Sequence, residues 1–210
     1  MRTGNHVVLV PGGLYEDMDS TRFWVDPGIL AGLQSAGCRV TAIDRIRHPL
    51  TWAQDAAALA AAISEHGVVG ATVVAGSNGC SAAVRLALDH PRVVARLVLC
   101  WPATAGDRRV DRISRAAITD GAGEEVAEGL LAGDTLRGIS DNELQALRIP
   151  VAVVPSEPEN PHHQASTVVA LARLLPNVTV TDGYPESPRP EFPPLCADFV
   201  TTLAGLLACG

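Results

Sequence analysis

Two hydrophobic patterns alternate along this chain. One consists of short, continuous apolar runs rich in Val and Leu. Runs of this kind, without polar alternation, are typical of strands buried on both faces. They predict strands at Val7–Val10, Arg39–Ile43, Ala71–Ala75, Arg96–Cys100, Val151–Val154 and Val178–Thr181.

The other pattern has helical spacing and occupies the stretches between these runs. It predicts helices at Gly28–Ala36, Trp52–His66, Asn78–Asp89, Ala165–Leu175 and Ala197–Ala208. Regular alternation of strands and helices favours a parallel sheet covered by helices on both faces. The predicted fold class is therefore α/β, a mostly parallel, doubly wound sheet of about six strands. The 210 residues are expected to form a single domain, 1–210.

Residues 104–148 interrupt this alternation, because they contain no strand pattern. Ser140 and Glu143 have the spacing of a capping box, which marks the start of a helix. The segment leaves the carboxyl end of a predicted strand, and ligands bind at that edge of open α/β sheets. We therefore predict a short helical lid over a binding site, with space-filling helices as the alternative. The predicted helices are Asp107–Ala117, Gly123–Ala132 and Asp141–Leu147.

The sequence VVAGSNGCS, Val73–Ser81, joins a predicted strand directly to a predicted helix. Ser77 stands there between the small residues Ala75 and Gly79, close to the pattern G-x-S-x-G. At such a turn the strand and helix backbones nearly touch, and the serine hydroxyl stands clear at the carboxyl end of the sheet. Ser77 is therefore the candidate nucleophile. The alternative is a tight turn with an incidental serine.

Composition restricts the classes of partner. Sixteen basic and 23 acidic residues give a net charge of −7, which disfavours nucleic acids and anionic membrane surfaces as partners. The five cysteines form no regular framework, as in proteins of reducing compartments. Cys38, Cys80 and Cys100 have apolar neighbours and are expected to be small core residues.

Targeting and membrane segments are not indicated by the sequence. The apolar run Val7–Val10 is too short for a signal peptide. The apolar stretch Phe199–Cys209 is too short to span a bilayer and suits a docking helix. We expect a soluble cytoplasmic protein whose partner is a small-molecule substrate. The sequence does not indicate an oligomeric state.

Several segments together resemble the α/β-hydrolase superfamily, and the resemblance covers nearly the whole chain outside residues 104–148. The two leading antiparallel strands of larger members have no counterpart here, so a trimmed core of about six strands is implied. The matching segments are VLVPGG (Val8–Gly13), RVTAID (Arg39–Asp44), VVAGSNG (Val73–Gly79), ALDHPRVVARLVLCWPA (Ala87–Ala103) and IPVAVVPSEPEN (Ile149–Asn160).

This resemblance implies a serine hydrolase that acts on a small ester, thioester or lactone. Ser77 would attack the carbonyl carbon and form an acyl-enzyme. The oxyanion would be held by the backbone N–H of Asn78 and that of Gly13 or Leu14. Such preorganised donors contribute roughly 3–4 kcal/mol each to lowering the barrier. No cofactor is implied.

The base is displaced from its usual position. The family's histidine follows the final strand, but residues 181–194 contain none. A serine hydroxyl needs a base to become nucleophilic. We predict His163, which follows the fifth strand, with His162 and His48 as alternative bases. In the simpler interpretation, His162 and His163 only open a helix. No acidic residue or cysteine lies at ligand spacing from this pair, so no metal is expected.

The acid partner has three candidates. Loop length places Glu159 where the family has its acid, although Glu159 could equally be a surface charge. If the histidine has moved into this loop, the acid can have moved to the last loop, as Asp182 or Glu186. Such an exchange is permitted because triads are defined by role and geometry rather than by order.

The rest of the site is less sharply defined. Trp24 and Trp101 are predicted to line an apolar acyl pocket. Glu16 and Asp17 would repel an anionic substrate, or they form a solvated acidic turn. Two other functions remain open, a non-hydrolytic lyase or cyclase in which Ser77 donates a hydrogen bond, and a binding protein without catalysis. Resemblance in fold alone does not choose among these functions.

Overall fold

A parallel six-stranded sheet forms the centre of the molecule, with strand order β2-β1-β3-β4-β5-β6. The computed structural model describes residues 6–207. Every neighbouring pair of strands is parallel, so the predicted fold class is confirmed. Each predicted strand is present, with its ends shifted by no more than a residue or two. The strands are β1 (His6–Val10), β2 (Arg39–Ala42), β3 (Ala71–Gly76), β4 (Val94–Cys100), β5 (Val151–Val154) and β6 (Val178–Val180).

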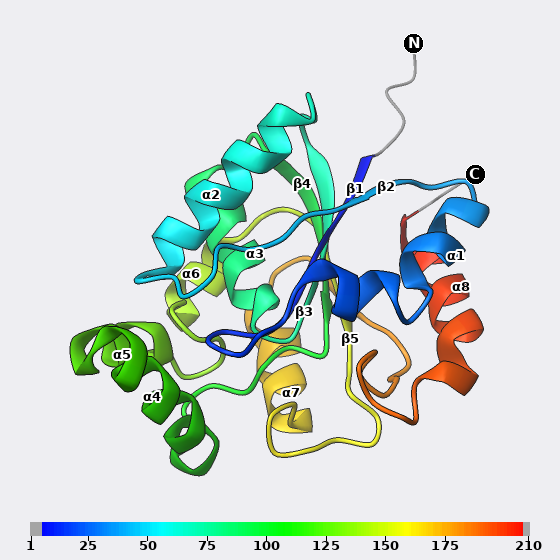
Figure 1. Cartoon of the computed structure of the whole chain (residues 1–210). Helices are drawn as coiled ribbons and strands as arrows, with labels where there is room; N and C mark the ends of the chain where they lie inside the picture. The colour runs from blue at the N-terminus through cyan, green and yellow to red at the C-terminus, as the bar shows by residue number, and fades with distance from the viewer. Residues whose placement is uncertain (1–5, 208–210) are drawn as a thin grey trace.

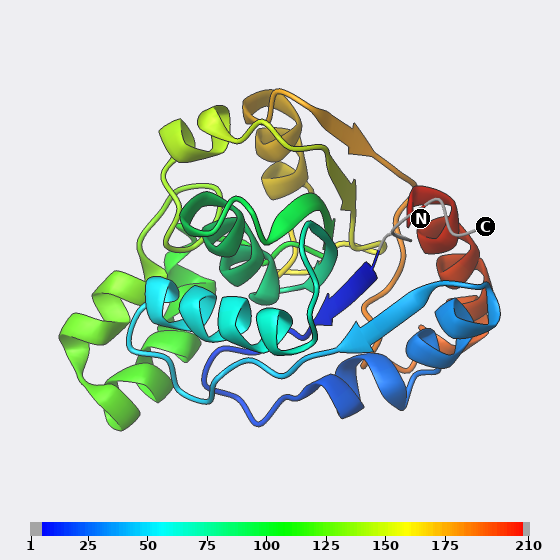
Figure 2. The same ribbon diagram turned by 90° about the horizontal axis from the view of Figure 1, so that it is seen from above.

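Helices cover both faces of this sheet (Figures 1 and 2). Successive side chains of a strand point to opposite faces, so Val7 packs with α1 and α8, whereas Val8 packs with α2 and α3. Both faces are apolar, which explains the continuous hydrophobic runs in the sequence. The helices are α1 (Ile29–Ser35), α2 (Trp52–Glu65), α3 (Gly79–Asp89), α7 (Ala165–Leu174) and α8 (Cys196–Leu207).

The insertion at residues 104–148 contains α4 (Arg108–Ala122), α5 (Glu124–Leu131) and α6 (Asp141–Ala146). The capping box of Ser140 and Glu143 is formed as predicted. Helix α4 extends beyond the predicted Ala117. Buried residues of the insertion join the core on the α2–α3 face, so this segment is anchored to the domain. They include Ile118, Leu130, Leu136, Ile139 and Leu144.

Two short helical turns are not predicted by the hydrophobic pattern, because neither is long enough to show a helical period. One is a π-helical turn at Thr21–Val25, and the other is a 3₁₀ turn at Pro193–Leu195. Ala208, the predicted end of the last helix, lies outside the described residues, as does Cys209. Within residues 6–207, no helix has both the length and the apolar character needed to span a membrane.

The cysteines differ in their bonding. Cys80, Cys100 and Cys196 are free thiols. Cys38 lies in the core as expected, but it is disulfide-bonded. The expectation that Cys38 is a small core residue is confirmed, and the disulfide is a further feature that the sequence pattern did not indicate.

Helix α3 packs so closely on the segment after β1 that its first residue has to be glycine. A Cβ at Gly79 would lie 2.4 Å from the carbonyl oxygen of Pro11. The oxygen is a backbone atom and the backbone fixes the position of a Cβ, so this contact cannot be relieved by rotating a side chain. The position of α3 against the sheet therefore depends on Gly79.

We expect Gly79→Ala to destabilise the fold by at least about 2 kcal/mol, the scale of overpacking in a dense core. Gly205→Ala is the matched control, because nothing lies within 4 Å of a Cβ built there. In the exposed interior of α8, alanine should stabilise the protein by about 0.5–1 kcal/mol. Urea unfolding measures both changes. Equal midpoints for the two variants would contradict this account of Gly79.

Candidate active site

Ser77 occupies the turn between β3 and α3 in a left-handed backbone conformation, with φ of +50°. Its N–H donates to the Cys100 carbonyl at 3.0 Å, which ties the turn to the end of β4. The preceding Gly76 has no room for a side chain, since a Cβ there would lie 2.3 Å from the Phe23 ring. Backbone strain at a non-glycine residue costs of order 1–3 kcal/mol, and such strain clusters at functional sites.

His163 reaches this serine from the loop between β5 and α7. Its Nε2 lies 2.9 Å from Ser77 Oγ, which is hydrogen-bond distance. Two backbone hydrogen bonds join Asn160 and His163 reciprocally, at 3.0 and 3.4 Å. On the next residue, Gln164 N–H donates to Thr104 Oγ1 at 2.9 Å. The loop therefore holds the imidazole in place from both sides.

Glu186, in the segment after β6, meets the other nitrogen of this imidazole. Its Oε1 lies 2.7 Å from His163 Nδ1. The same oxygen accepts hydrogen bonds from Ser156 Oγ, at 2.6 Å, and from Asn160 Nδ2. Arg189 Nε lies 2.6 Å from the second carboxylate oxygen. Ser77, His163 and Glu186 thus form one continuous chain of polar contacts.

The contacts of Glu186 decide its charge. Burial raises the pKa of this carboxyl, but hydrogen bonds from His163 and Ser156 outweigh burial and hold the pKa at about 2, below the usual 4.5. A carboxylate at this pKa remains an anion at neutral pH. It can therefore fix the tautomer of His163 and stabilise a protonated imidazole.

Trp101 supports the segment that contains Glu186. Its Nε1 donates to the Tyr184 carbonyl at 2.8 Å, and its ring stacks on Phe199 with a centroid distance of 5.0 Å. Trp24 lies beside it in the same aromatic core. Both tryptophans have 0% of their surface exposed. The prediction that Trp24 and Trp101 line an acyl pocket is therefore wrong, because both rings are buried in the core and neither lines the cavity over Ser77.

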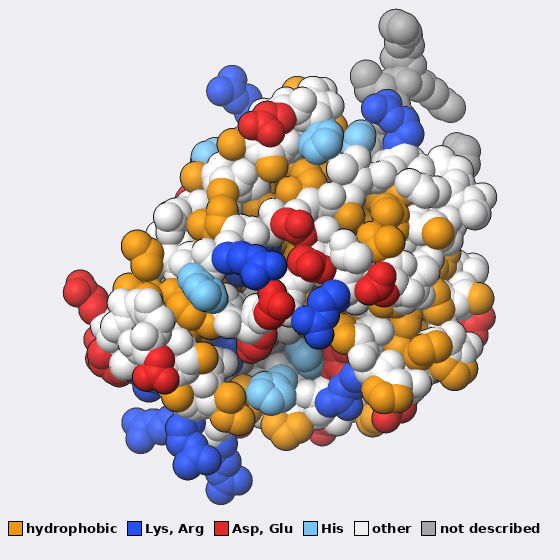
Figure 3. All heavy atoms as spheres, viewed as in Figure 1, with side chains coloured by type: hydrophobic (Ala, Val, Ile, Leu, Met, Phe, Trp, Pro, Cys, Tyr) orange, Lys and Arg blue, Asp and Glu red, His pale blue; other side chains and the backbone are white. Residues whose placement is uncertain are grey.

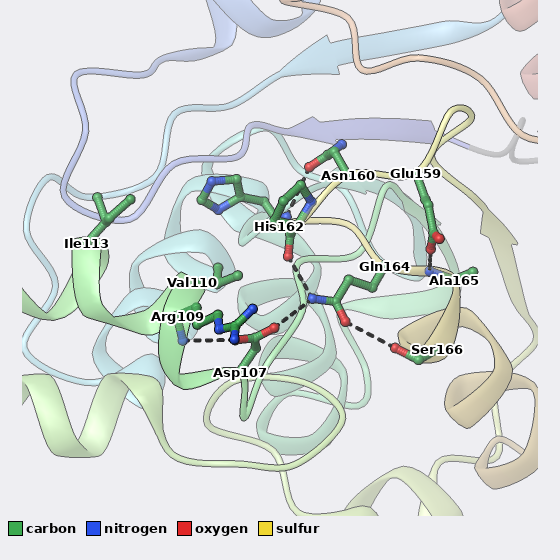
Figure 4. A pocket seen from close by; sticks show the side chains of 11 residues that line it. Asp107, Arg109, Val110, Ile113, Glu159, Asn160, His162, Gln164, Ala165 and Ser166 are labelled. Atoms are coloured by element: carbon green, nitrogen blue, oxygen red, sulfur yellow. Dashed lines mark hydrogen bonds between the residues drawn. The ribbon is translucent and has the colours of Figure 1, made fainter.

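A cavity of about 320 Å³ opens over Ser77. Its polar lining includes Glu16, Asn78, His163 and Glu186. A larger cavity of about 890 Å³ adjoins it, and Asn160 and His162 line both. Figure 4 shows this second cavity between α4, which contributes Val110 and Ile113, and the start of α7.

The glycine turn after β1 lies at the edge of the smaller cavity. Gly13 has φ of +77°, a conformation that glycine adopts without a steric penalty. The Leu14 N–H donates to Glu16 Oε2 at 2.6 Å. Within the described residues, the N–H groups of Gly13 and Asn78 have no acceptor. These two N–H groups are therefore available to a ligand oxygen, whereas the N–H of Leu14 is occupied.

No family model matches this chain, and no curated protein matches its sequence. Solved structures match it over almost its full length. A meta-cleavage product hydrolase from Pseudomonas fluorescens has a TM-score of 0.72 at 15% identity, over 98% of this chain and 91% of that chain. Naproxen esterase from Bacillus subtilis has a TM-score of 0.65 at 15% identity, over 97% and 84%. Carboxylesterase CesB from Bacillus subtilis has a TM-score of 0.66 at 17% identity, over 98% and 85%.

This chain has the α/β-hydrolase fold. The resemblance noted in the sequence is thus confirmed at the level of the fold. The elements that the resemblance assigned to the nucleophile turn and the glycine loop occupy the carboxyl edge of the sheet.

Two of the predicted acids do not reach the histidine. Glu159 is exposed, and its Oε2 accepts the Ala165 N–H at the start of α7 at 2.7 Å. Asp182 is exposed near the end of β6. The chain needs four more residues to turn back toward His163, and Glu186 then makes the contact. The predicted contact of the histidine with Glu159 or Asp182 is therefore corrected to a contact with Glu186.

The alternative bases also lie elsewhere. His48 stacks on Tyr15 with a ring distance of 4.7 Å and lines a separate cavity beside Arg45. His162 is an exposed residue that lines the site cavity. Its backbone N–H donates to Asn160 Oδ1 and its carbonyl accepts from the Thr104 N–H. Among residues 6–207, no three His, Cys, Asp or Glu side chains are grouped as a metal site.

The sequence reasoning missed Ser156 and Asn160, which hold Glu186 and the His163 loop. Both lie in the same β5–α7 loop as the histidine, within PSEPENPHH. Two polar residues within the loop that carries a candidate base were the available signal. That signal becomes specific only once the path of the Glu186 segment is known.

Glu186 should make the stability of the fold depend on acid pH. Its depressed pKa means that the folded state binds this proton less readily, so its stabilisation is present above pH about 4.5 and is lost as the pH falls toward 2. Between about pH 6 and pH 3 this loss is about 2 kcal/mol. Glu186→Gln should lack it, and urea unfolding at stepped pH measures the difference.

Asp182→Asn keeps Glu186 and should keep the wild-type fall in stability. An E186Q profile parallel to that of the wild type would show that the Glu186 carboxylate is not stabilised as its contacts indicate.

Proposed function

We propose that this protein is a serine hydrolase that cleaves a small ester, thioester or lactone through an acyl-enzyme on Ser77. The observation that carries the proposal is the chain of contacts from Ser77 Oγ to His163 Nε2, at 2.9 Å, and from His163 Nδ1 to Glu186, at 2.7 Å. Nucleophile, base and orienting acid at these distances are the parts that acyl transfer by serine requires.

In this mechanism, His163 Nε2 accepts the Ser77 proton as Oγ attacks the carbonyl carbon. The negative charge that develops on the carbonyl oxygen is held by the N–H groups of Gly13 and Asn78. Glu186 stabilises the imidazolium that forms. His163 then protonates the leaving group, and the acyl group remains on Ser77. A water molecule, deprotonated by His163, releases the acid product.

The proposed base and acid are exchanged relative to the family's order. His163 follows β5, where the family has its acid, and Glu186 follows β6, where it has its histidine. The neighbouring positions of β5 and β6 make the exchange feasible, since both loops end at the same edge of the sheet. Three of the solved structures similar to this chain are described as a naproxen esterase, a carboxylesterase and a hydrolase, which supports a hydrolytic reaction.

The cavity supports a substrate that is small and without strong net charge around its carbonyl. Its volume of about 320 Å³ is at the lower end for ligand sites. Glu16 and Arg189 both line it, so neither sign of charge dominates. Figure 3 shows the same mixture on the face in view, where acidic and basic side chains lie interspersed near the middle.

A fluorophosphonate probe tests the nucleophile. The wild type should be labelled, and Ser77→Ala should abolish labelling, because the probe reacts only with an activated serine. Wild-type protein that is folded but unlabelled would contradict the proposal and favour a lyase, a cyclase or a binding protein.

Hydrolysis of p-nitrophenyl acetate tests the base and the acid. His163→Ala and Glu186→Gln should each lower kcat by about 10²–10⁴-fold, the scale of general-base and orienting contributions. His162→Ala and Glu159→Gln are matched controls from the same loop and should stay within about threefold of the wild type. A large loss in His162→Ala with His163→Ala active would reassign the base.

A further inference from the structure

Arg45, at the carboxyl end of β2, is a buried cation that belongs to neither the nucleophile nor its base. Its side chain is 6% exposed and pairs with Asp55 of α2, whose side chain is 0% exposed. Nε and Nη2 of Arg45 donate to the same Asp55 oxygen at 2.9 and 2.7 Å. This ion pair leaves Nη1 free to bind another group.

That remaining nitrogen donates to the glycine turn after β1. Nη1 lies 2.5 Å from the Gly13 carbonyl oxygen and 3.3 Å from that of Gly12. In a planar trans peptide, the C=O of one residue and the N–H of the next point in opposite directions. With the two carbonyls facing Arg45, the N–H groups of Gly13 and Leu14 must therefore face away from it.

The opposite side of this turn is the Ser77 cavity. A Cβ built at Gly12 would lie 2.9 Å from Ser77 Cβ, so the turn packs directly on the nucleophile. Gly13 and Glu16 line the Ser77 cavity as well as the cavity beside Arg45, and the Leu14 N–H donates to the carboxylate of Glu16. The turn is thus oriented so that its donors bind negatively charged oxygen. Two consecutive glycines permit many backbone conformations, so this orientation needs an external constraint, and Arg45 supplies one.

Stability alone is a weak reason for this arrangement. Desolvating two charges is costly, and replacing a buried ion pair by apolar residues of similar size is often neutral or stabilising. Within the described residues, the other oxygen of Asp55 has no hydrogen-bond partner, so the pair is not fully compensated. The hydrogen bonds from Arg45 to the two carbonyls are what this buried charge adds to the site.

We propose that Arg45, held by Asp55, is a positioning residue that orients the donors of the oxyanion site. This inference rests on the proposed function, because an oxyanion forms only if Ser77 attacks a carbonyl. It extends that function by assigning a role to the loop after β2, which contains none of Ser77, His163 and Glu186.

Arg45→Met tests the role with p-nitrophenyl acetate. We expect kcat to fall by about 10²–10³-fold, the effect of losing one oxyanion donor, with KM within about threefold of the wild type. Arg45→Lys keeps a charge that can reach a carbonyl but lacks the guanidinium fork, and it should recover at least about tenfold of the loss. Wild-type kcat in a folded Arg45→Met protein would overturn the proposal.

The double variant R45M/D55M separates positioning from folding. It replaces the ion pair by apolar side chains, so its urea midpoint should equal or exceed that of the wild type, while kcat stays as low as in Arg45→Met. Recovery of kcat along with stability would mean that Arg45 has a merely structural role, which overturns the proposal. The double variant decides the question if Arg45→Met does not fold.

A readout without turnover distinguishes this proposal from the function on which it rests. The amide ¹⁵N and ¹H resonances of Gly13 and Leu14 should shift in R45M/D55M and stay in place in Ser77→Ala. If the wild type has no esterase activity, the proposed function fails, and these resonances still report whether Arg45 orients the turn. Unshifted resonances would overturn the positioning role.

Discussion

The contact between Glu186 and His163 is the interaction on which the site depends. It joins two loops that leave neighbouring strands, β5 and β6, and it places the imidazole against Ser77 at the end of β3. Burying a carboxylate is costly unless it is hydrogen-bonded and paired. Here Ser156, Asn160 and Arg189 surround Glu186 in addition to the histidine. The charge is therefore retained where the proposed mechanism needs it.

A second constraint comes from the other half of the sheet. The turn after β1 provides backbone donors, and Arg45 after β2 holds that turn by its carbonyls. The carboxyl ends of parallel strands lie at one edge, so segments that are distant in sequence meet without any strand changing direction. The close packing of Gly79 on the Pro11 carbonyl fixes the β1 segment against α3, which begins one residue after Asn78. The nucleophile turn and the donor turn are thus held by the same packing contact.

Much of this architecture could be predicted from the sequence, because local rules govern it. Continuous Val-rich runs identified the strands, and small residues around Ser77 identified the turn. Local rules could not identify the carboxylate that contacts His163. It depends on the path of the segment after β6, which is set by contacts from Trp101 to Tyr184 and from Ser187 to Phe23, across 83 and 164 positions. The position of the Trp101 side chain was predicted wrongly for a related reason. Its φ of +50° belongs to the turn after β4, where a hydrophobic residue can face either the site or the core.

The exchange of base and acid is possible because the proposed mechanism requires a particular geometry and no particular order of the residues along the chain. The imidazole needs one nitrogen at the serine and the other at a carboxylate. Two adjacent parallel strands supply two adjacent loops, and either loop can hold either group if its length allows. In this chain the β5–α7 loop is closed by the reciprocal bonds of Asn160 and His163, which brings the histidine to Ser77. The longer segment after β6 is fastened to the aromatic core through Tyr184 and Ser187, and Glu186 lies between these two anchors. The side chain with the strictest geometric demand, the base, therefore lies on the shorter loop, and the acid on the segment that the core holds in place.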